Sequence, residues 1–439
     1  MRVAVVGAGH VGLVTAACLA EKGHEVVCAD VDAERVRAVE AGRTYVYEPG
    51  LDELVGRNAG DRLRATTDVR AAVSASELSL IAVPVPLERG EHEALDVLRA
   101  VSREIGAALR GRGDHHAVVV KSTVLPGTTT KVVKPLVEEA SGGAPFGIAM
   151  NPEFLTEGTA VADFMEPDRI VLGTEDERTL DALERLYVGF GGARVRTTPT
   201  TAETIKLASN ALLATMISFA NELADLATAL GDVDVTEVTQ GIHLSRYLTL
   251  DGGARAPLAA YLEAGCGFGG SCLPKDLAAL HRHARRAGAP MELLEAVERV
   301  NGRRASELLA LVRRRLGALD GARISVLGVS FKPDTDDVRA SPAFPVVAQL
   351  LAEGATVRIY DPVATEAFLA ACPPPAPAAA PSLADALAAD AAVIVTRWSE
   401  FETIPSLLRD RPDPPLVVDG RRMLAPHDVP RYAGIGLGR

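Results

Sequence analysis

The feature that most constrains the fold is a glycine-rich turn close to the N-terminus. A short run of apolar and β-branched residues, Arg2–Val6, is followed by the segment GAGHVG at residues 7–12, and a helical apolar pattern then continues to Gly23. This order predicts a strand, a tight turn and a helix. The three glycines allow the turn and let the backbone approach a pyrophosphate, which is stabilised at the positively polarised N-terminus of the helix. The segment therefore predicts a dinucleotide-binding site.

The second predicted strand, Glu25–Asp30, indicates which dinucleotide is bound. It ends at Asp30, 18 residues after Gly12, where a carboxylate can accept a hydrogen bond from a ribose 2′-hydroxyl. The same carboxylate would repel a 2′-phosphate. We therefore expect NAD rather than NADP.

An alternative interpretation of the N-terminus is a signal peptide, because Arg2 precedes an apolar stretch that ends in ACLA at residues 17–20. Three glycines and His10 interrupt that stretch, which fits the strand, turn and helix better. We expect the segment to be retained in the mature protein.

The overall charge and the cysteine content argue against several classes of protein. The chain has 46 Lys and Arg against 58 Asp and Glu, a formal net charge of −12, whereas a general nucleic-acid binder needs a basic face. No apolar stretch of 18 or more residues without polar breaks occurs, so we expect no membrane-spanning helix. Five cysteines, an odd number in a long chain, fit reduced thiols in the cytoplasm better than a disulfide framework. We expect no metal site, because neither a CxxC pair nor a histidine cluster supplies a tetrahedral ligand set.

Short apolar runs alternate with helix-length segments in two parts of the chain, which is typical of βαβ units and mainly parallel sheets. We expect an α/β fold with two Rossmann-like, doubly wound domains joined by a long central helix. The tract CPPPAPAAA, residues 372–380, is expected to be a solvated loop. The predicted strands are Arg2–Val6, Glu25–Asp30, Leu78–Val83, Ala117–Lys121, Phe146–Met150, Arg169–Gly173, Arg323–Gly328, Thr356–Tyr360, Ala392–Thr396 and Leu416–Asp419.

A helix of about 30 residues is predicted between the two parts. The segment TTAE, residues 200–203, matches a capping box in which the Thr200 hydroxyl accepts from a backbone N–H and Glu203 reaches back. No Gly or Pro follows as far as Leu230, and Gly231 suits the position after a helix. A helix about 45 Å long, at 1.5 Å per residue, suits a connector or a subunit interface.

Two polar residues on this predicted helix, Lys206 and Asn210, are four residues apart and so share one face. They are either a solvated surface pair, or a cation and an amide that face a substrate hydroxyl or a developing oxyanion.

The segment GCGFGGSCLPKD, residues 265–276, predicts a reactive cysteine. Because Pro274 suits the first turn of a helix, Cys272 would lie at a helix N-terminus beside Lys275, and both effects favour the thiolate. Asp276 could orient Lys275 or act as a base. We expect Cys272 to be a nucleophile, and the other four cysteines to be structural.

Three further polar segments follow predicted strands: Lys121–Thr128, Asn151–Gly158 and Phe331–Arg339. The first two place hydroxyls and carboxylates at the carboxyl edge of a parallel sheet, where ligands of α/β proteins bind. The third offers Lys332 and Arg339 to an anion. Each segment is also compatible with an ordinary polar loop.

Together these motifs resemble the UDP-glucose/GDP-mannose dehydrogenase family. Six segments occur in the family's order over nearly the whole chain: GAGHVGL, STVLPGT, NPEFLTEG, ETIKLASN, GFGGSCLPKD and FKPDTDDVR. The resemblance implies an NAD-binding Rossmann domain at 1–198, a central helical dimerisation domain with the cysteine loop at 199–305, and a nucleotide-sugar-binding Rossmann-like domain at 306–439. It also implies a homodimer that oxidises the C6 alcohol of a nucleotide sugar to a carboxylate, using two NAD⁺.

The resemblance assigns a role to each matching residue. Cys272 would attack the C6 aldehyde to form a thiohemiacetal, and a second hydride transfer would give a thioester that water hydrolyses. Arg246 matches an arginine that reaches the substrate of a partner subunit. The residues implied in catalysis are Cys272, Lys206, Asn210, Asp276, Thr123 and Glu157. Those implied in cofactor binding are Gly7, Gly9, His10, Val11, Gly12, Asp30, Arg35, Thr123, Glu157 and Arg339. Those implied in substrate binding are Glu153, Phe154, Leu155, Lys206, Asn210, Arg246, Tyr261, Gly269, Lys332 and Arg339.

The chain departs from the family pattern at three places. Val85 stands where a threonine is usual, Ala340 replaces the common Glu after Arg339, and about Leu250–Pro257 forms an insertion. The segment PDRIVLG is similar to UDP-glucose enzymes, whereas CLPKD also occurs in GDP-mannose dehydrogenases. UDP-glucose is favoured, and GDP-mannose, dTDP-glucose and UDP-N-acetyl sugars are alternatives.

Two other functions are compatible with part of the pattern. A β-hydroxyacid dehydrogenase also combines a Rossmann domain with a helical Lys-x-x-x-Asn, but it makes one NADH per substrate and lacks the cysteine loop. A non-catalytic nucleotide-sugar sensor would bind its ligand without turnover.

Overall fold

The first sheet of the structure, a computed structural model that describes residues 1–87, 91–250 and 254–438, has eight strands in the order β3-β2-β1-β4-β5-β6-β7-β8. All neighbouring pairs are parallel except β6 and β7. The strands are β1 (Arg2–Val6), β2 (Glu25–Ala29), β3 (Leu63–Thr66), β4 (Leu78–Ile81), β5 (His116–Val120), β6 (Phe146–Met150), β7 (Arg169–Gly173) and β8 (Ala193–Thr197). The parallel pairing brings the loops after β1, β2, β4, β5 and β6 to one carboxyl edge, as in other doubly wound sheets.

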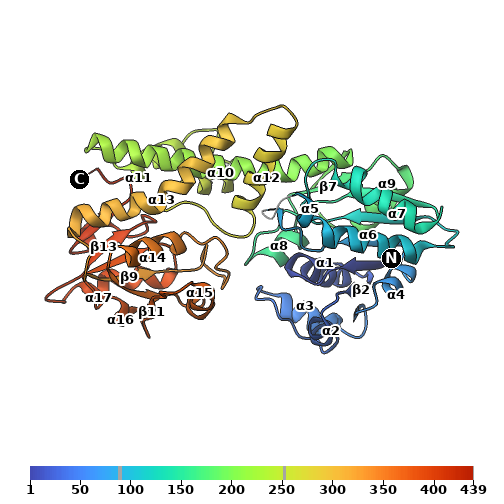
Figure 1. Ribbon diagram of the computed structural model, residues 1–439, viewed down its shortest axis with the longest axis horizontal. Helices are drawn as coiled ribbons and strands as arrows, with labels where there is room; N and C mark the ends of the chain where they lie inside the picture. Colours follow the sequence, from blue (N-terminus) through green and yellow to red (C-terminus); the bar gives the residue numbers. More distant parts are fainter. Residues whose placement is uncertain (88–90, 251–253, 439) are drawn as a thin grey trace. The chain divides into compact units, whose positions relative to one another are not determined.

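Helices flank this sheet (Figure 1). They are α1 (His10–Glu21), α2 (Ala33–Glu40), α3 (Leu51–Asn58), α4 (Val69–Ser74), α5 (Glu91–Ala94), α6 (Asp96–Leu109), the π-helical η2 (Thr129–Val133), α7 (Lys134–Ser141), α8 (Ala160–Met165) and α9 (Glu177–Leu186). Helices α1, α3, α8 and α9 share one buried apolar core with alternate residues of β1, β4 and β5. Successive side chains of a strand point to opposite faces of the sheet. When both faces are buried, both sets of side chains are apolar, so the strand reads as a continuous apolar run.

All six strands predicted in this part of the chain form, within one to two residues at their ends. The prediction missed β3 and β8, which lie at the two edges of the sheet. Only the first residue of β3 is buried, and β8 contains two arginines and no buried residue. Edge strands of this kind lack the apolar signal on which the prediction depended.

The long predicted helix is α10 (Pro199–Leu230), a single helix of 32 residues. Its predicted capping box is wrong. The hydroxyl of Thr198, not of Thr200, accepts from the backbone N–H of Thr201 at 3.2 Å, and Glu203 bonds to another loop instead of reaching back. Gly231 has a positive φ of 80°, as expected for the residue after a helix.

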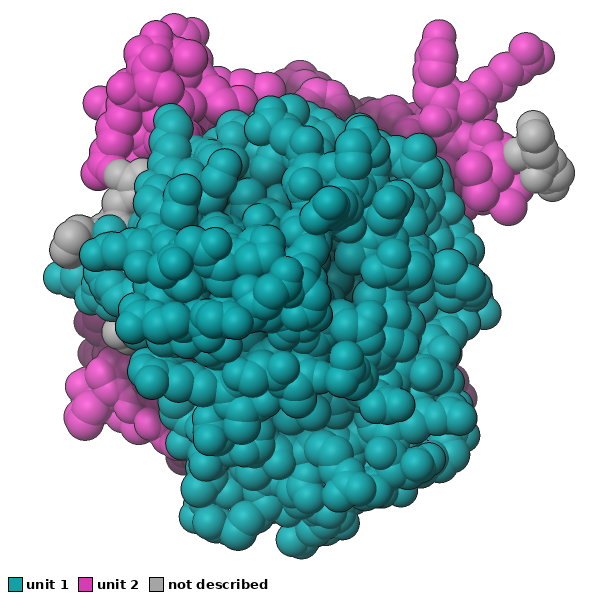
Figure 2. Space-filling model, turned by 90° about the vertical axis from the view of Figure 1, so that its right-hand side faces the viewer, with its two compact units in different colours: residues 1–209 teal, residues 210–439 magenta. Residues whose placement is uncertain are grey.

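The structure divides within α10 into two units, residues 1–209 and 210–439, which Figure 2 shows in different colours. In unit 2 a six-stranded, all-parallel sheet has the order β11-β10-β9-β12-β13-β14. Its strands are β9 (Arg323–Leu327), β10 (Thr356–Tyr360), β11 (Ala378–Ala379), β12 (Ala391–Ile394), β13 (Leu416–Asp419) and β14 (Tyr432–Gly434). The four strands predicted here form, and β11 and β14, which are short edge strands, were missed.

The helices that follow α10 are α11 (Val235–His243), η3 (Pro257–Tyr261), α12 (Leu273–Arg286), α13 (Glu292–Leu316), α14 (Ala343–Ala352), α15 (Thr365–Ala371), α16 (Leu383–Ala386), η4 (Ser399–Thr403), α17 (Ile404–Leu408) and η5 (Pro426–Asp428). Residues of α10 and α13 share one apolar core with β9, β10, β12 and β13. The expected boundary between a central and a C-terminal domain at residue 305 therefore lies within one unit, and it stays a prediction.

Two further expectations concern loops of unit 2. The tract 372–380 is not wholly a solvated loop, because Ala378 and Ala379 pair with β10 and Ala380 is buried. Of the predicted insertion, residues 251–253 lie outside the described residues, and Leu250 donates its N–H to the carbonyl of Ala254 at 2.7 Å. None of the helices in the described ranges combines the length and the hydropathy that crossing a bilayer requires.

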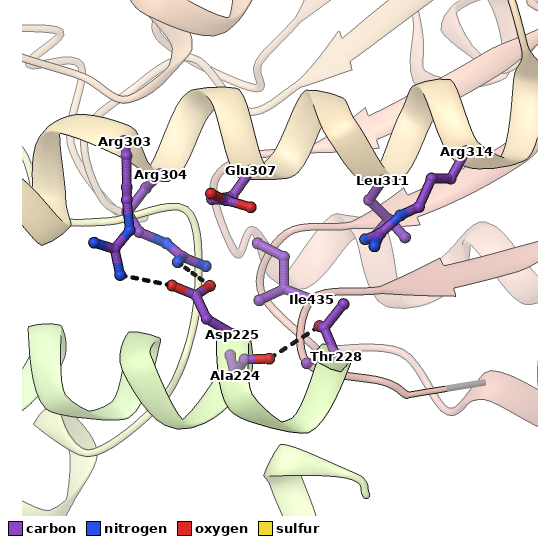
Figure 3. Close-up of a pocket in the computed structure, with 10 residues that line it drawn as sticks. Ala224, Asp225, Thr228, Arg303, Arg304, Glu307, Leu311, Arg314 and Ile435 are labelled. Carbon is purple, nitrogen blue, oxygen red and sulfur yellow. Dashed lines mark hydrogen bonds and ion pairs between the residues drawn. The ribbon is translucent and has the colours of Figure 1, made fainter. Parts of the chain in front are cut away.

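A buried arginine joins α10 to α13 in unit 2. Arg304 is 1% exposed, and its guanidinium donates to Asp225 at 2.5 Å and to the carbonyl of Gly265 at 3.3 Å. Arg303, which is exposed, donates to the same carboxylate at 3.0 Å. Figure 3 shows both arginines reaching Asp225 at one end of a pocket that also contains Glu307 and Arg314. Because Arg304 is buried and Arg303 is exposed, the two arginines contribute unequally to stability.

We expect Arg304→Met to lower the free energy of unfolding by about 2–3 kcal/mol, because it leaves a half-buried carboxylate and the Gly265 carbonyl without their donor. Arg303→Met is the matched control and should cost less than about 1 kcal/mol. Chemical denaturation followed by circular dichroism measures both. Equal losses in the two variants would contradict the assignment.

Candidate active site

The glycine turn follows β1 as predicted and begins α1. Gly7 has a φ of +103°, and a Cβ there would lie 2.5 Å from the carbonyl oxygen of Ala82. A Cβ on Gly12 would lie 1.8 Å from the carbonyl oxygen of Gly7. Gly9 is different, because a Cβ at this position would meet nothing within 4 Å. Gly7 and Gly12 thus serve close packing, whereas Gly9 leaves space at the N-terminus of α1, where a pyrophosphate would fit.

Asp30 lies directly beside this turn. One carboxylate oxygen accepts from the Ala8 N–H at 2.6 Å, and the other accepts from the Asp32 N–H at 2.9 Å. Arg35 lies 3.6 Å from Asp30 and stacks over the ring of Tyr45, at 5.5 Å from its centroid. Each carboxylate oxygen can accept a further hydrogen bond, so Asp30 suits the ribose hydroxyls of NAD, and the residues fit this cofactor.

A carboxylate that the sequence analysis missed connects the glycine turn to a second loop. Glu48 is buried, and its carboxylate lies 2.9 Å from the ring nitrogen of His10. It also accepts from the N–H groups of Gly158 at 2.9 Å and Ala160 at 2.8 Å. Glu48 therefore holds the end of the Asn151–Gly158 segment, which carries half-buried Glu157, close to the first turn of α1. No spacing rule linked position 48 to either motif.

The segment after β5 is held by Glu203 of α10. The fully buried carboxylate accepts from the N–H groups of Gly127 at 2.5 Å and Thr129 at 2.7 Å. Thr123, between β5 and this anchor, is half-buried at the carboxyl edge of the sheet. Val85, the departure after β4, is a buried apolar side chain at the same edge.

A buried ion pair occupies the loop after β6. The Lys206 ammonium lies 2.9 Å from one oxygen of Glu153, and the other oxygen accepts from the Leu155 N–H at 2.7 Å. The ring of Phe154 packs against two cations, with Arg169 at 3.9 Å and Lys206 at 5.5 Å from its centroid. Burial raises the pKa of Glu153, but the charge and hydrogen bond of Lys206 and the Leu155 N–H outweigh it, so the pKa is lowered overall. Lys206 is therefore a buried, oriented cation, and the alternative of a solvated surface pair is wrong.

In unit 2, Cys272 is the residue that precedes α12, as predicted, and it is exposed. Its Sγ lies 3.5 Å from the Ser271 hydroxyl. One turn on, Asp276 is fully buried and pairs with Lys275 at 2.5 Å. The other Asp276 oxygen accepts from the amide of Asn210 at 2.7 Å. The thiol thus stands at the N-terminus of a helix whose first turn carries an oriented lysine and carboxylate, which is an arrangement that can activate a nucleophile.

The glycine-rich loop before Cys272 lies against the Phe331–Arg339 segment. Gly270 donates its N–H to the Arg339 carbonyl at 3.0 Å, and a Cβ on Gly269 would lie 2.2 Å from the Ala340 carbonyl oxygen. Two of the substrate-binding candidates, Gly269 and Arg339, therefore lie on two segments that pack against each other. Asn221, Asn301 and Arg421, side chains that no motif indicated, hold the same loop by its backbone.

The remaining candidates are less closely assembled. The Arg339 guanidinium donates to the Asp337 carboxylate at 2.6–2.9 Å, and the Lys332 ammonium lies 5.9 Å from the Phe331 ring centroid. Tyr261 ends η3 and is half-buried, and Arg246 is exposed. Within the described ranges, no three His, Cys, Asp or Glu side chains converge as a metal site would require.

Four cysteines have environments that disfavour the thiolate. Burial raises the pKa of Cys18 and Cys28 to about 12, and burial also raises the pKa of Cys266 and Cys372. Of the five cysteines, all within the described ranges, Cys272 is the exposed one.

Comparisons with known proteins show the family of the chain. Family models match residues 1–191 (UDP-glucose/GDP-mannose dehydrogenase family, NAD binding domain), 200–303 (central domain) and 325–426 (UDP binding domain). The chain is 42% identical to the UDP-glucose 6-dehydrogenase AglM of Haloferax volcanii over 436 residues, 97% of each chain. It is 38% identical to the GDP-mannose 6-dehydrogenase of Pseudomonas aeruginosa over 372 residues, 82% of this chain and 81% of that protein. A UDP-glucose dehydrogenase structure from Pyrobaculum islandicum aligns with a TM-score of 0.90 at 38% identity, covering 99% of this chain and 97% of that one.

The two kinds of glycine in the turn should respond differently to an added methyl group. We expect Gly12→Ala to lower the free energy of unfolding by about 2–3 kcal/mol, because its Cβ would overlap backbone. Gly9→Ala should stay within about 1 kcal/mol of wild type yet weaken NAD binding, since its Cβ would enter the space for the pyrophosphate. Denaturation and isothermal titration with NAD measure the two effects. Destabilisation by Gly9→Ala, or full NAD affinity in that variant, would be the contrary result.

Proposed function

The chain belongs to the UDP-glucose/GDP-mannose dehydrogenase family, and we propose that it oxidises the C6 hydroxyl of UDP-glucose to the carboxylate of UDP-glucuronate. The observation that carries the proposal is Cys272, an exposed thiol before α12 beside the Lys275–Asp276–Asn210 set. An alcohol-to-ketone dehydrogenase has no need for a nucleophilic thiol. A four-electron oxidation does, because a covalent thioester holds the carbon between two hydride transfers.

The first oxidation removes a proton from the C6 hydroxyl and a hydride from C6. When bound, NAD⁺ accepts the hydride, which is the chemistry that a nicotinamide supplies. In the proposal, the Glu153–Lys206 pair contacts the C6 oxygen, and Glu157 or a water held by Thr123 takes up the proton. The Lys206 charge, fixed by Glu153, favours negative charge on oxygen.

The second oxidation proceeds through Cys272. Its thiolate forms a bond to the aldehyde carbon, and the resulting oxyanion is stabilised by Lys206 and by the amide of Asn210. The thiohemiacetal carbon gives up a second hydride, which a second bound NAD⁺ would accept, and becomes a thioester. Water positioned by Asp276 then attacks the thioester carbon and gives one proton to the Asp276 carboxylate. The C–S bond breaks, the Cys272 thiolate is regenerated, and the sugar acid leaves as its carboxylate after losing its second proton to solvent. Asp276 suits this step because it is buried and already oriented by two donors.

The remaining proposed contacts are those with the nucleotide part of the substrate. Lys332 and Arg339 supply positive charge for the diphosphate, and the Phe154–Leu155 backbone and Tyr261 contact the remainder. Asp337 holds Arg339, so a diphosphate competes with this carboxylate for the guanidinium. We favour UDP-glucose over GDP-mannose as the substrate because a relative named for UDP-glucose aligns over 97% of the chain, whereas one named for GDP-mannose aligns over 82%.

The product stoichiometry tests the reaction. We expect two NADH per UDP-glucose consumed, and a lower rate with GDP-mannose, dTDP-glucose and UDP-N-acetylglucosamine. Cys272→Ser should lower kcat by on the order of 10³-fold or more, because the hydroxyl is not a comparable nucleophile at neutral pH. Cys372→Ser, at a half-buried thiol, serves as control and should retain activity. NADH absorbance together with chromatography of the sugar products measures both.

Several outcomes would contradict this proposal. One NADH per substrate would indicate a two-electron dehydrogenase. Binding without turnover, unaffected by Cys272→Ser, would indicate a sensor. A higher kcat/KM for GDP-mannose than for UDP-glucose would keep the reaction and change the substrate.

We further propose that the protein is a homodimer that associates through α10. Leu212, Phe219 and Leu226 are spaced by seven residues on this helix and are 54%, 49% and 53% exposed. Seven residues are almost two helical turns, so the three side chains follow one stripe about 21 Å long. A second copy of the chain would cover this stripe. Arg246, next to Tyr247, which is 95% exposed, is suited to reach the substrate of that copy.

The double variant Phe219→Glu/Leu226→Glu should be monomeric at micromolar concentration, because it places charges in an apolar contact. Glu222→Gln, an exposed polar position on the same helix, is the matched control and should remain dimeric. Sedimentation velocity measures the masses. A dimeric double variant would place the interface elsewhere.

A further inference from the structure

A second buried lysine lies near the Glu153–Lys206 pair. Lys121 is the first residue after β5 and is 3% exposed. Its ammonium donates to the side-chain oxygen of Asn151 at 3.2 Å and lies 5.5 Å from the ring centroid of Phe164. Burying a charged group costs free energy unless it is paired or hydrogen-bonded, so the burial of Lys121 calls for an explanation. Neither the cofactor nor the sugar chemistry described above uses Lys121.

Asn151, which receives this hydrogen bond, is the residue that starts the loop carrying Glu153. Its side-chain oxygen also accepts from the Tyr187 hydroxyl at 2.5 Å, and its side-chain nitrogen donates to the Val171 carbonyl at 2.9 Å. Its backbone N–H donates to the Val120 carbonyl at 2.8 Å. Asn151 is therefore fixed from β5, β7 and the end of α9, and Glu153 follows two residues later.

The charges around Lys121 form a small buried group. Glu153 is attracted to both Lys121 and Lys206, and the two ammonium groups repel each other. Burial is the main cause that lowers the pKa of Lys121, to about 8. The attraction of Glu153 opposes this shift, and the repulsion of Lys206 adds to it. Tyr187 faces the same site as a neutral donor, because burial raises the pKa of its hydroxyl. Near pH 7, two cations thus face one carboxylate.

We propose that Lys121 is a positioning residue of the oxidation site: it anchors the start of the Glu153 loop through Asn151 and keeps the Glu153 carboxylate ionised. Only the catalytic effect of that ionisation rests on the proposed function; the anchoring of the loop does not. An ionised Glu153 pairs with Lys206 and holds its ammonium in place. A protonated Glu153 would lose that ion pair and release Lys206.

The network permits a test that separates charge from hydrogen bonding. Lys121→Met removes the charge and one hydrogen bond to Asn151, whereas Tyr187→Phe removes the other hydrogen bond to the same oxygen and no charge. Lys134→Met, the same substitution at an exposed position of α7, is the matched control. Should Lys121→Met not fold, Lys121→Gln keeps a donor for Asn151 without a charge and replaces it.

The measurement is kcat/KM for UDP-glucose between pH 4 and 8 with saturating NAD⁺. Because Glu153 has a lowered pKa, the wild-type activity should persist at mildly acidic pH and fall as pH drops through that pKa. Without the nearby cation the pKa rises, so in Lys121→Met the fall should begin about one pH unit higher. Tyr187→Phe and Lys134→Met should keep the wild-type limb.

A wild-type acid limb in Lys121→Met, or an equal shift in Tyr187→Phe, would overturn the proposal. Thermal melting over the same pH range gives a readout that needs no turnover. A carboxylate with a lowered pKa stabilises the fold above its unfolded pKa and loses this contribution on acidification. The unfolded-state pKa sets where this loss begins, and the difference between the two pKa values sets its size, so the acid-induced fall in Tm should be smaller in Lys121→Met than in wild type and in Tyr187→Phe. If wild type does not oxidise UDP-glucose, the proposed function fails and the melting comparison still decides the role of Lys121.

Discussion

The structure depends on one helix that satisfies buried polar groups of three loops and of α12. Along α10, Glu203 accepts from the Gly127–Thr129 backbone, Lys206 pairs with Glu153, Asn210 bonds Asp276, and Asn221 accepts from the Gly265 N–H. The intervals of 3, 4 and 11 residues between these side chains are those of one helical face. A buried polar group without a partner costs more than a surface hydrogen bond gains. Each pairing therefore fixes both the helical side chain and the loop that it meets.

This arrangement explains how a chain with a net charge of −12 can be suited to two anionic ligands. The cations that matter are local and held in place: Lys206 by Glu153, Lys275 by Asp276, and Arg339 by Asp337. Each has an acidic partner within hydrogen-bonding distance, so its charge is oriented instead of diffuse. The glycine turn adds backbone N–H groups, which carry no formal charge at all. Net charge thus informs about the class of partner and not about the site.

Much of the fold could be predicted from the sequence, the motifs supplied the candidate site residues, and the failures share a cause. The central strands are buried on both faces, so their apolar runs are visible, whereas β8 is half exposed and reads as a polar segment. The TTAE segment has the spacing of a capping box, but Glu203 makes its hydrogen bonds with Gly127 and Thr129, 74 to 76 residues away. Glu48 bonds Gly158 at a separation of 110 residues. A local pattern carries no information about such distant partners.

The sequence by itself determined the α/β class, the glycine turn after the first strand, the place of Cys272 at a helix start and the long helix. All four depend on local chemistry: glycine conformation, a residue's position relative to a helix start, and apolar periodicity. Only the tertiary structure decided that Lys206 is a buried ion-paired cation and not a solvated one, and that a second buried lysine, Lys121, bonds the residue that starts the Glu153 loop. Burial and charge pairing are properties of residues brought together by the sheet edge and α10, and the distance between those residues along the chain hides them from any short motif.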